Sequence, residues 1–245
     1  MKKLKFTFKN AAGEELAGLL ELPENPKAFA LLAHCFTCGK DLKGAARIAR
    51  KLTENAIAVL RFDFTGLGNS EGDFSNTNFS SNISDLLCAV DYLRRQYEAP
   101  SLLIGHSLGG SAILSIAGEV PEAKAVVTIG SPGELTHVKR LFKDDVENIN
   151  QHGAYPVELA GRVFTLKKQM LDNIQEHKIA HKVFAMNKPL LIFHATEDDT
   201  VLIEQAEKIF KAAKHPKSFI SLGKADHLLT HAQDAEYLSL IHISE

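Results

Sequence analysis

The stretch SLLIGHSLGG, residues 101–110, joins a short apolar run to a turn made of small residues. SLLIG (101–105) predicts a buried strand, and the small residues from Ser107 to Gly118 predict a helix that opens at the turn. Between them GHSLG (105–109) fits G-x-S-x-G, the pattern of a nucleophilic serine on a sharp strand-to-helix turn. The glycines are needed because side chains there would clash with the strand and the helix. We therefore expect Ser107 to be a strained, exposed nucleophile rather than part of an ordinary glycine-rich turn.

A serine hydroxyl is a poor nucleophile, so the chain must also supply a base and an acid that orients the base. With this turn the chain order is serine, acid, histidine. His227 follows the predicted last strand, SFISL (218–222), and fits the base; the alternative is a surface-loop histidine. The preceding strand, PLLIFHA (189–195), leads to three consecutive carboxylates, Glu197, Asp198 and Asp199. The sequence thus predicts acyl transfer with one of these three as the acid.

Strand and helix patterns alternate along most of the chain. Continuous apolar runs such as AFALLAH (28–34) are typical of strands buried on both faces. Such alternation predicts an α/β fold with a mostly parallel central sheet and helices on both faces. The predicted strands are 4–9, 15–22, 28–34, 56–63, 101–105, 125–130, 189–195 and 218–222, and the predicted helices are 44–55, 80–97, 107–118, 201–213 and 233–240.

Residues 131–188 interrupt this alternation, because they contain no further buried strand. They hold two amphipathic charged segments around a turn-rich piece, NQHGAYPVELAGR. The interval is too long for a loop between packed elements. We interpret it as an inserted cap or lid, which leaves residues 1–130 and 189–245 as the core domain.

The composition is that of an ordinary globular protein, with 45% hydrophobic and 24% charged residues and a net charge of −2. The balanced charge offers no footprint for nucleic acid or an anionic membrane, so we expect a small-molecule partner. The N-terminal MKKLKFTFKN alternates polar and apolar residues, unlike a signal peptide, and no apolar run is long enough to span a membrane. Three cysteines cannot make a disulfide framework, so a cytoplasmic location is predicted.

Four motifs in this order resemble the esterase group of bacterial α/β-hydrolases: HCFTC (34–38), GHSLGG (105–110), HATEDDTV (194–201) and Asp226-His227. The resemblance covers residues 29–231 and implies the α/β-hydrolase fold. It also implies that Asp198 is the acid and that the backbone N–H groups of Phe36 and Leu108 form the oxyanion hole. It makes the loop at 62–74 one wall of the site, and it implies neither a cofactor nor a metal.

The chain departs from this family's pattern where Cys35, Cys38 and Ala195 replace glycines. Cysteine tolerates a positive φ poorly, so we expect a slightly different oxyanion loop. The HCFTC version resembles hydrolase domains fused to a C-terminal OsmC-like peroxide-reductase domain, which the 245 residues do not include. The ending SLIHISE (239–245) resembles a translated adapter fragment, so we expect the natural chain to continue. A homodimer is a further possible assembly of this chain.

Cys35 and Cys38 also form a C-x-x-C motif shortly before a predicted helix, where a thioredoxin-like redox pair would lie. A thiol-based redox protein is therefore the rival from another class, although it leaves Ser107, Asp198 and His227 unexplained. A regulatory redox role for the pair stays open. A metal site from His34, Cys35 and Cys38 lacks a fourth ligand at a recognisable spacing. A non-catalytic binding module would normally have lost one residue of the triad.

The predicted activity is that of a serine carboxylesterase acting through an acyl-enzyme, with thioesters and lactones as alternatives for the same triad. The resemblance favours short or aromatic acyl groups. The interval 131–188 is short for a lipase lid and has few large aromatic residues, which also favours short acyl chains. The spacing of the family that the chain resembles, with Val201 three residues on, implies Asp198 among the three carboxylates. The other two are then expected to face solvent or to cap a helix that begins near Val201, with Asp199 as the candidate cap.

Overall fold

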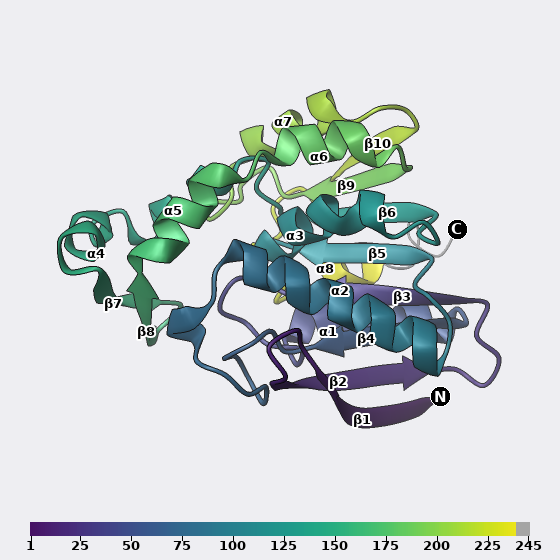
Figure 1. Ribbon diagram of the computed structural model, residues 1–245. Coiled ribbons are helices and arrows are strands. Elements are labelled where there is room, and N and C mark those ends of the chain that lie inside the picture. Colours follow the sequence, from purple (N-terminus) through teal and green to yellow (C-terminus); the bar gives the residue numbers. More distant parts are fainter. Residues whose placement is uncertain (239–245) are drawn as a thin grey trace.

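An eight-stranded sheet forms the centre of the computed structural model, which describes residues 1–238 (Figure 1). The strand order is β1-β2-β4-β3-β5-β6-β9-β10. The pairs β1–β2 and β2–β4 are antiparallel, and every other neighbouring pair is parallel. The strands are β1 (Lys2–Lys9), β2 (Glu15–Leu22), β3 (Ala28–Ala33), β4 (Ile57–Phe62), β5 (Leu102–His106), β6 (Ala125–Ile129), β9 (Leu190–His194) and β10 (Lys217–Ser221).

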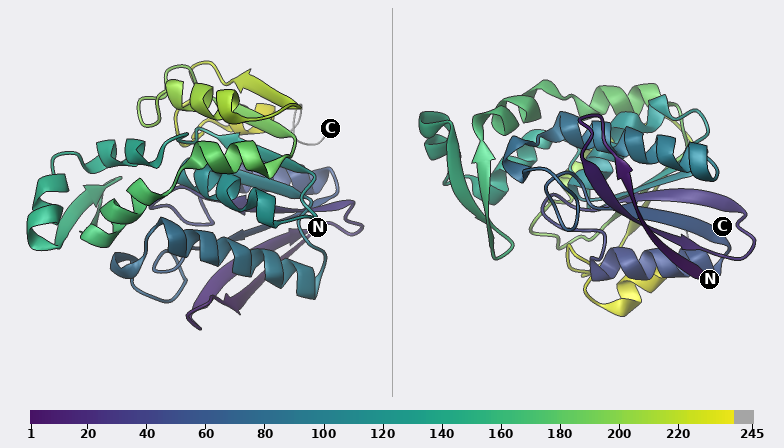
Figure 2. Two further views of the ribbon diagram at one scale, coloured as in Figure 1. Left: turned by 45° about the horizontal axis from the view of Figure 1, so that its top comes forward. Right: turned by 60° about the horizontal axis from the view of Figure 1, so that its bottom comes forward.

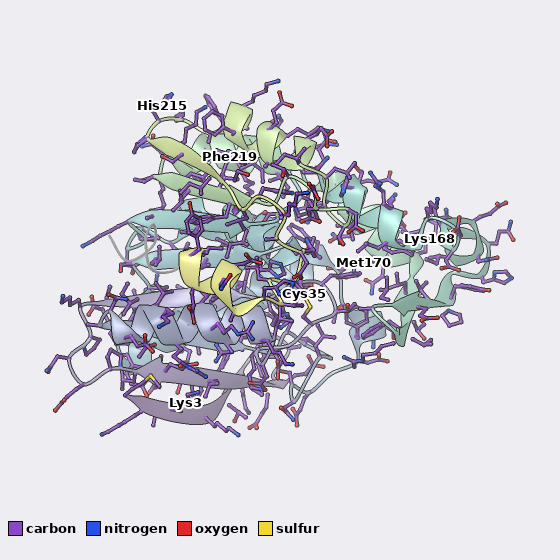
Figure 3. The ribbon with its side chains drawn as sticks, turned by 180° about the vertical axis from the view of Figure 1, so that it is seen from behind. Lys3, Cys35, Lys168, Met170, His215 and Phe219 are labelled. Atoms are coloured by element: carbon purple, nitrogen blue, oxygen red, sulfur yellow. A yellow bond between two sulfur atoms is a disulfide. The ribbon has the colours of Figure 1, made fainter. Side chains whose placement is uncertain are left out.

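Helices cover both faces of this sheet, because its central strands are apolar on both sides (Figure 2). The helices α1 (Lys43–Glu54) and α8 (Ala232–Leu238) pack together on one face, and a view from behind has them in front of the sheet (Figure 3). The other face carries α2 (Phe79–Gln96), α3 (Leu108–Ile116), α6 (Ile179–Met186) and α7 (Glu204–Ala212). The predicted α/β architecture is confirmed, and every strand predicted for the core is present.

The carboxyl ends of the parallel strands meet at one edge of the sheet. There β3 leads into the loop with Cys35, β5 ends at His106, β6 leads to Gly130 and β9 ends at His194. In open α/β sheets ligands bind at this edge, outside the carboxyl ends of the strands. The loops that follow these strands therefore define the region where a functional site is expected.

The interval between β6 and β9 adds separate elements, most of which project from one end of the core, while α6 packs against α3 on one face of the sheet (Figure 1). It contains the 3-10 helix η3 (Leu135–Phe142), α4 (Val146–His152), a two-stranded sheet of β7 (Ala154–Leu159) and β8 (Arg162–Lys167), α5 (Lys168–Glu176) and α6. The segment expected to be rich in turns is thus an antiparallel hairpin. Its turn lies at Ala160 and Gly161, which both have positive φ angles, as a tight hairpin requires. Sequence reasoning missed the hairpin because its strands are largely exposed and one contains Pro156.

Among residues 1–238 no helix is both long and apolar enough to cross a bilayer. The last predicted helix is present as α8, whose described part ends at Leu238. The interpretation of SLIHISE concerns residues 239–245, which lie outside the described residues.

Candidate active site

Ser107 lies at the turn between β5 and α3 with a backbone conformation that residues other than glycine rarely adopt, φ 54° and ψ −128°. The neighbouring glycines permit this turn, because a Cβ atom at Gly105 would lie 2.5 Å from the carbonyl oxygen of Gly109. A Cβ atom at Gly109 would lie 2.7 Å from the carbonyl oxygen of Ala33, in the strand that leads to the Cys35 loop. The Ser107 N–H donates to the Ile129 carbonyl at 2.8 Å and ties the turn to β6. The predicted strained strand-to-helix turn is therefore present, but the expectation of an exposed serine is wrong, because Ser107 is buried, with 8% of its surface exposed.

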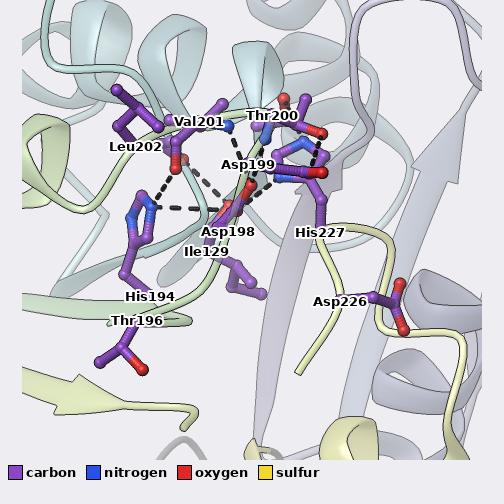
Figure 4. A network of polar contacts seen from close by, with 12 residues as sticks. Ile129, His194, Thr196, Asp198, Asp199, Thr200, Val201, Leu202, Asp226 and His227 are labelled. Atoms are coloured by element: carbon purple, nitrogen blue, oxygen red, sulfur yellow. Dashed lines mark hydrogen bonds and ion pairs between the residues drawn. The ribbon is translucent and has the colours of Figure 1, made fainter. Parts of the chain in front are cut away.

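Ser107, His227 and Asp198 form a continuous chain of hydrogen bonds, although they are far apart in the sequence. Figure 4 shows the half of this chain that joins His227 to Asp198. His227 Nδ1 lies 2.7 Å from Asp198 Oδ2, and His227 Nε2 lies 3.0 Å from Ser107 Oγ. A carboxylate can only accept, so Nδ1 carries the proton, and Nε2 of the neutral ring is free to accept from the serine hydroxyl. The side chain of Asp198 is 1% exposed and that of His227 is 9% exposed. The arrangement can deprotonate the serine and hold the resulting imidazolium.

Of the three consecutive carboxylates, Asp198 is the one that reaches His227. Its second oxygen, Oδ1, accepts the backbone N–H groups of Thr200 at 3.0 Å and Val201 at 2.9 Å. Glu197 is exposed and forms a 3.3 Å ion pair with Lys224. The geometry therefore brings the predicted acid to the histidine and leaves its neighbours in solvent.

Asp199 faces solvent, which is one of the two expected outcomes, and the alternative that it caps the following helix is wrong. α7 begins at Glu204, and its N-cap residue, Ile203, makes no side-chain cap hydrogen bond. Asp199 is exposed and accepts only a 3.3 Å hydrogen bond from the Thr200 hydroxyl. The reason is that Asp198 already accepts the N–H groups of the next turn, so the helix starts later than the apolar pattern indicated.

Two opposing effects act on the pKa of Asp198. Burial by itself raises the pKa, but the hydrogen bond and charge of His227 and the Val201 N–H lower it further than burial raises it. The net pKa of Asp198 is therefore below its ordinary value, and the carboxylate stays ionised beside the histidine.

The loop that carries His227 is held by the residue before it. Asp226 accepts the backbone N–H groups of Leu228 at 2.9 Å and Thr230 at 3.0 Å, and the Thr230 hydroxyl at 2.6 Å. These bonds close a tight turn in which Leu229 has a φ of 53°. The sequence indicated Asp226 as part of a motif but did not reveal this local role.

The backbone N–H groups of Phe36 and Leu108, predicted to form an oxyanion hole, donate to no acceptor in the described part of the chain. Leu108 is the first residue of α3, where the helix dipole favours negative charge. The loop with Phe36 follows β3, whose last carbonyl closely approaches the Ser107 turn at Gly109. Both groups thus belong to segments that meet beside Ser107.

A buried ion pair between Lys40 and Asp63, which sequence reasoning missed, lies next to the loop that carries Phe36. Lys40 Nζ lies 2.6 Å from Asp63 Oδ2, and the Lys40 N–H donates to Asp63 Oδ1 at 2.7 Å. Arg61, itself paired with Glu21 at 2.6 Å, donates to the Lys40 carbonyl. Burial raises the pKa of Asp63, but its hydrogen bonds from Lys40 and Asn69 lower it to a net value below the ordinary one. The available signal was a carboxylate at the end of a predicted buried strand.

Cys35 and Cys38 form a disulfide with their Cα atoms 5.3 Å apart, so Phe36 lies inside a short covalent loop. The cysteine count excluded a disulfide framework, but the C-x-x-C motif left an oxidised Cys35–Cys38 pair open, and this is the pair that is bonded. Cys35 is buried and Cys38 is half-buried. Ala195, the third departure from glycine, is buried directly after β9.

The crystal structure of the esterase domain of a Rhodothermus marinus protein has 45% sequence identity to this chain. The match covers 98% of this chain and 95% of that domain, with a TM-score of 0.79. The chain belongs to the α/β-hydrolase family. The profile described as serine aminopeptidase, S33, matches residues 24–144 of this hydrolase. The predicted relationship to the esterase group of bacterial α/β-hydrolases is therefore confirmed.

Two more distant relatives extend the comparison. Est1E of Butyrivibrio proteoclasticus, solved with ferulic acid, has 22% identity over 98% of this hydrolase and 100% of that chain, and its TM-score of 0.82 shows the shared fold. The mitochondrial palmitoyl-protein thioesterase ABHD10 of Bos taurus has 26% identity over 151 residues, 59% of this chain. The match covers 48% of that thioesterase, so this hydrolase spans about half the length of the curated relatives it matches first.

Proposed function

We propose that this hydrolase is a serine carboxylesterase in which Ser107 is the nucleophile, His227 the base and Asp198 the acid. The observation that carries the proposal is the hydrogen-bonded chain from Ser107 Oγ through the His227 ring to Asp198 Oδ2, at 3.0 and 2.7 Å. Its support is the strained turn that holds Ser107.

In the proposed reaction His227 Nε2 takes the proton of Ser107 as Oγ attacks the ester carbonyl carbon. The imidazolium that forms is stabilised by Asp198, whose own pKa is below its ordinary value. The imidazolium then gives its proton to the leaving alkoxide as the C–O bond breaks, which leaves an acyl group on Ser107. Water, deprotonated by the same Nε2, attacks the acyl carbon and releases the acid and free Ser107.

The negative charge on the carbonyl oxygen is proposed to be stabilised by the N–H groups of Phe36 and Leu108. Both N–H groups are free of acceptors among residues 1–238, so no internal bond has to break when the oxyanion forms. Removal of one such donor typically lowers kcat by about 10² to 10³. The Lys40–Asp63 pair and its partners keep the Phe36 loop in place before substrate binds.

We propose that the insert at 131–188 acts as the cap of this site and limits the acyl group. A row of aromatic rings connects the oxyanion loop to the insert: Phe36 lies 5.6 Å from Phe74, and Phe74 lies 4.8 Å from Phe164 of β8. Such rings offer an apolar wall to a short or aromatic acyl group. Phe184, another large aromatic residue of the insert, is 59% exposed, and its ring contacts Lys214, whose Nζ lies 4.3 Å from the ring centroid.

Thioester hydrolysis is the second candidate, because the ABHD10 relatives are described as palmitoyl-protein thioesterases. The same triad and oxyanion hole serve both reactions, since only the leaving atom changes. A lactone would react in the same way. Turnover of an acyl thioester at least tenfold faster than that of the matching oxygen ester would favour this candidate over the carboxylesterase.

The test of the proposal combines an active-site label with a substrate panel. A fluorophosphonate should label the wild-type protein at Ser107 and leave Ser107→Ala unlabelled. The panel should contain p-nitrophenyl acetate, butyrate, benzoate and palmitate, a butyryl thioester, a γ-lactone and an aminoacyl p-nitroanilide. The carboxylesterase proposal predicts the highest kcat/KM for butyrate or benzoate. Labelling of the Ser107→Ala protein, or faster turnover of the anilide, would contradict it.

The predicted small-molecule partner is an ester. The predicted protein partners are a second copy of the chain, in a homodimer, and a C-terminal OsmC-like domain. Light scattering of the purified protein tests the dimer, and sequencing of the natural gene past codon 245 tests the additional domain. The cytoplasmic location also stays a prediction, which a fluorescent fusion can test.

A further inference from the structure

Two histidines outside the triad lie at the carboxyl ends of two core strands, β5 and β9, which flank β6, and point into the loops that carry the triad. His106 ends β5, and its Nε2 lies 2.7 Å from the backbone carbonyl oxygen of His227. His194 ends β9, and its Nε2 lies 2.7 Å from the backbone carbonyl oxygen of Val201, in the loop that follows Asp198 (Figure 4). Each ring thus connects a rigid strand to one of the two loops that meet at Ser107.

The tautomer of both rings follows from these contacts. A backbone carbonyl can only accept a hydrogen bond, so Nε2 of His106 and of His194 must carry the proton. Nδ1 of each ring is buried and has no partner in the described part of the chain. A second proton at Nδ1 would be a buried, unpaired donor on a buried charge, which is unfavourable. Both rings are therefore neutral donors.

The surroundings of His106 support the same conclusion. The cavity that it lines has a volume of only about 10 Å³, near the minimum for one water, and its other lining side chains are apolar. A water there would have too few polar partners to serve Nδ1. Burial lowers the pKa of His106 to about 3, and burial also lowers the pKa of His194. Both shifts favour the neutral form of the ring.

We propose that His106 and His194 are positioning residues, whose neutral Nε2–H groups hold the base loop and the acid loop in the geometry that joins Ser107, His227 and Asp198. This inference rests on the proposed function for its effect on catalysis. The bond from His106 acts on the carbonyl group adjacent to the Cα atom that carries the base, so it fixes the backbone from which that side chain extends. The rings of His106 and His227 also lie 5.0 Å apart, which adds a packing contact.

The bond from His194 acts on the other side of the triad. Val201 donates its N–H to Asp198 Oδ1 at 2.9 Å and accepts the His194 N–H with its carbonyl oxygen. Val201 is therefore held at both backbone groups, and through its N–H it fixes the rotation of the Asp198 carboxylate. His194 Nε2 is 3.8 Å from Asp198 Oδ2, too far for a hydrogen bond of its own. His194 thus acts through the backbone of Val201.

Four variants test the proposal through the donor rather than through side-chain volume. The Nε2 atom of glutamine is the same number of bonds from Cα as Nε2 of histidine, so His106→Gln and His194→Gln can keep the N–H donor. His106→Leu and His194→Leu remove it. Thr128→Val is the matched control, since Thr128 is equally buried in β6 and its hydroxyl has no partner among residues 1–238.

We expect each leucine variant to lower kcat for p-nitrophenyl butyrate by about 10², the scale of a 1 Å misplacement, with KM within about threefold. Each glutamine variant should recover at least tenfold of that loss, and Thr128→Val should stay within about twofold of wild type. Equal loss of kcat in the glutamine and leucine variants would overturn the proposal, and so would leucine variants with wild-type kcat. If a leucine variant does not fold, the proposal is tested by the kcat of the glutamine variant and by the tautomers of the two histidine rings.

A measurement independent of turnover separates this proposal from the proposed function. In Ser107→Ala protein labelled with ¹⁵N-histidine, ring nitrogen shifts should identify His106 and His194 as neutral Nε2–H tautomers. An Nδ1–H tautomer or a protonated ring at neutral pH would overturn the positioning role, whether or not the enzyme is an esterase. If Ser107→Ala keeps full esterase activity while both tautomers are as expected, the proposed function is wrong. The hydrogen bonds from His106 to His227 and from His194 to Val201 are then still supported.

Discussion

Asp198→Asn is the substitution whose effect on activity is most sharply determined by the geometry. The two carboxylate oxygens of Asp198 face different partners: Oδ2 accepts from His227 Nδ1, and Oδ1 accepts from the N–H groups of Thr200 and Val201. Asparagine has one oxygen and one NH₂ group. Placing the NH₂ group at Oδ1 would set it against two N–H donors, so the amide oxygen must take that position and the NH₂ group must face His227.

An NH₂ group at this position reverses the hydrogen bond to the histidine. His227 Nδ1 must then accept, which moves the ring proton to Nε2, the atom that has to take the proton of Ser107. The base is thereby lost although the shape of the site is kept. In the analogous triad this change lowers kcat by about 10⁴, equivalent to about 5 kcal/mol of transition-state stabilisation. We expect a loss of the same size here, with a melting temperature close to that of wild type.

The assay is steady-state hydrolysis of p-nitrophenyl butyrate, with thermal unfolding followed by circular dichroism. Asp199→Asn is the matched control, because Asp199 is adjacent and exposed and accepts only the 3.3 Å bond from Thr200. Its kcat should stay within about twofold of wild type. Its free energy of unfolding should also change by no more than about 0.5 kcal/mol, as is usual for surface substitutions. A tolerant Asp198→Asn together with an inactive Asp199→Asn would refute the reasoning and shift the acid by one position.

Four further outcomes are expected. Ser107→Ala should keep less than about a tenth of wild-type kcat with its fold intact, because the other groups act through this hydroxyl; more residual activity would contradict the nucleophile assignment. Hydrolysis of p-nitrophenyl esters should fall steeply from butyrate to palmitate, and activation at an oil interface would contradict the cap proposal. Replacement of Cys35 and Cys38 by glycine should keep activity within roughly tenfold, because the proposed donor is a backbone N–H; complete loss with the fold retained would favour the redox interpretation. The folded-state pKa of His106, about 3, is below its ordinary value of 6.5, so the unfolded chain binds more protons between these values and stability falls as the pH drops below about 6.5. In urea unfolding, the free energy of unfolding should fall between pH 7 and pH 5, and His106 should account for about 2 kcal/mol of this decrease. His106→Gln should lack this contribution.

Local sequence was sufficient to predict the elements of the core. The short apolar runs around 101–105 and 189–195 predict buried strands, and both are present. The glycines beside Ser107 predict a tight turn, and that turn leaves no room for Cβ atoms. These features depend on neighbours a few residues apart, so periodicity and turn chemistry reveal them. The hairpin of β7 and β8 was missed because its strands bury few side chains and the apolar signal there is weak.

The sequence by itself determined which residues could form the triad, because chain order after each strand restricts the choice to Ser107, His227 and three consecutive carboxylates. Among these three the family resemblance implied Asp198, but only the tertiary structure shows that Asp198 reaches the histidine while Asp199 faces solvent, since backbone direction within a loop depends on hydrogen bonds to distant segments. The same holds for the Lys40–Asp63 pair and for His106 and His194, whose partners lie on other loops. A lone buried polar residue carries no signal of its partner in the sequence, because the contact exists only once the carboxyl ends of the parallel strands have been brought together.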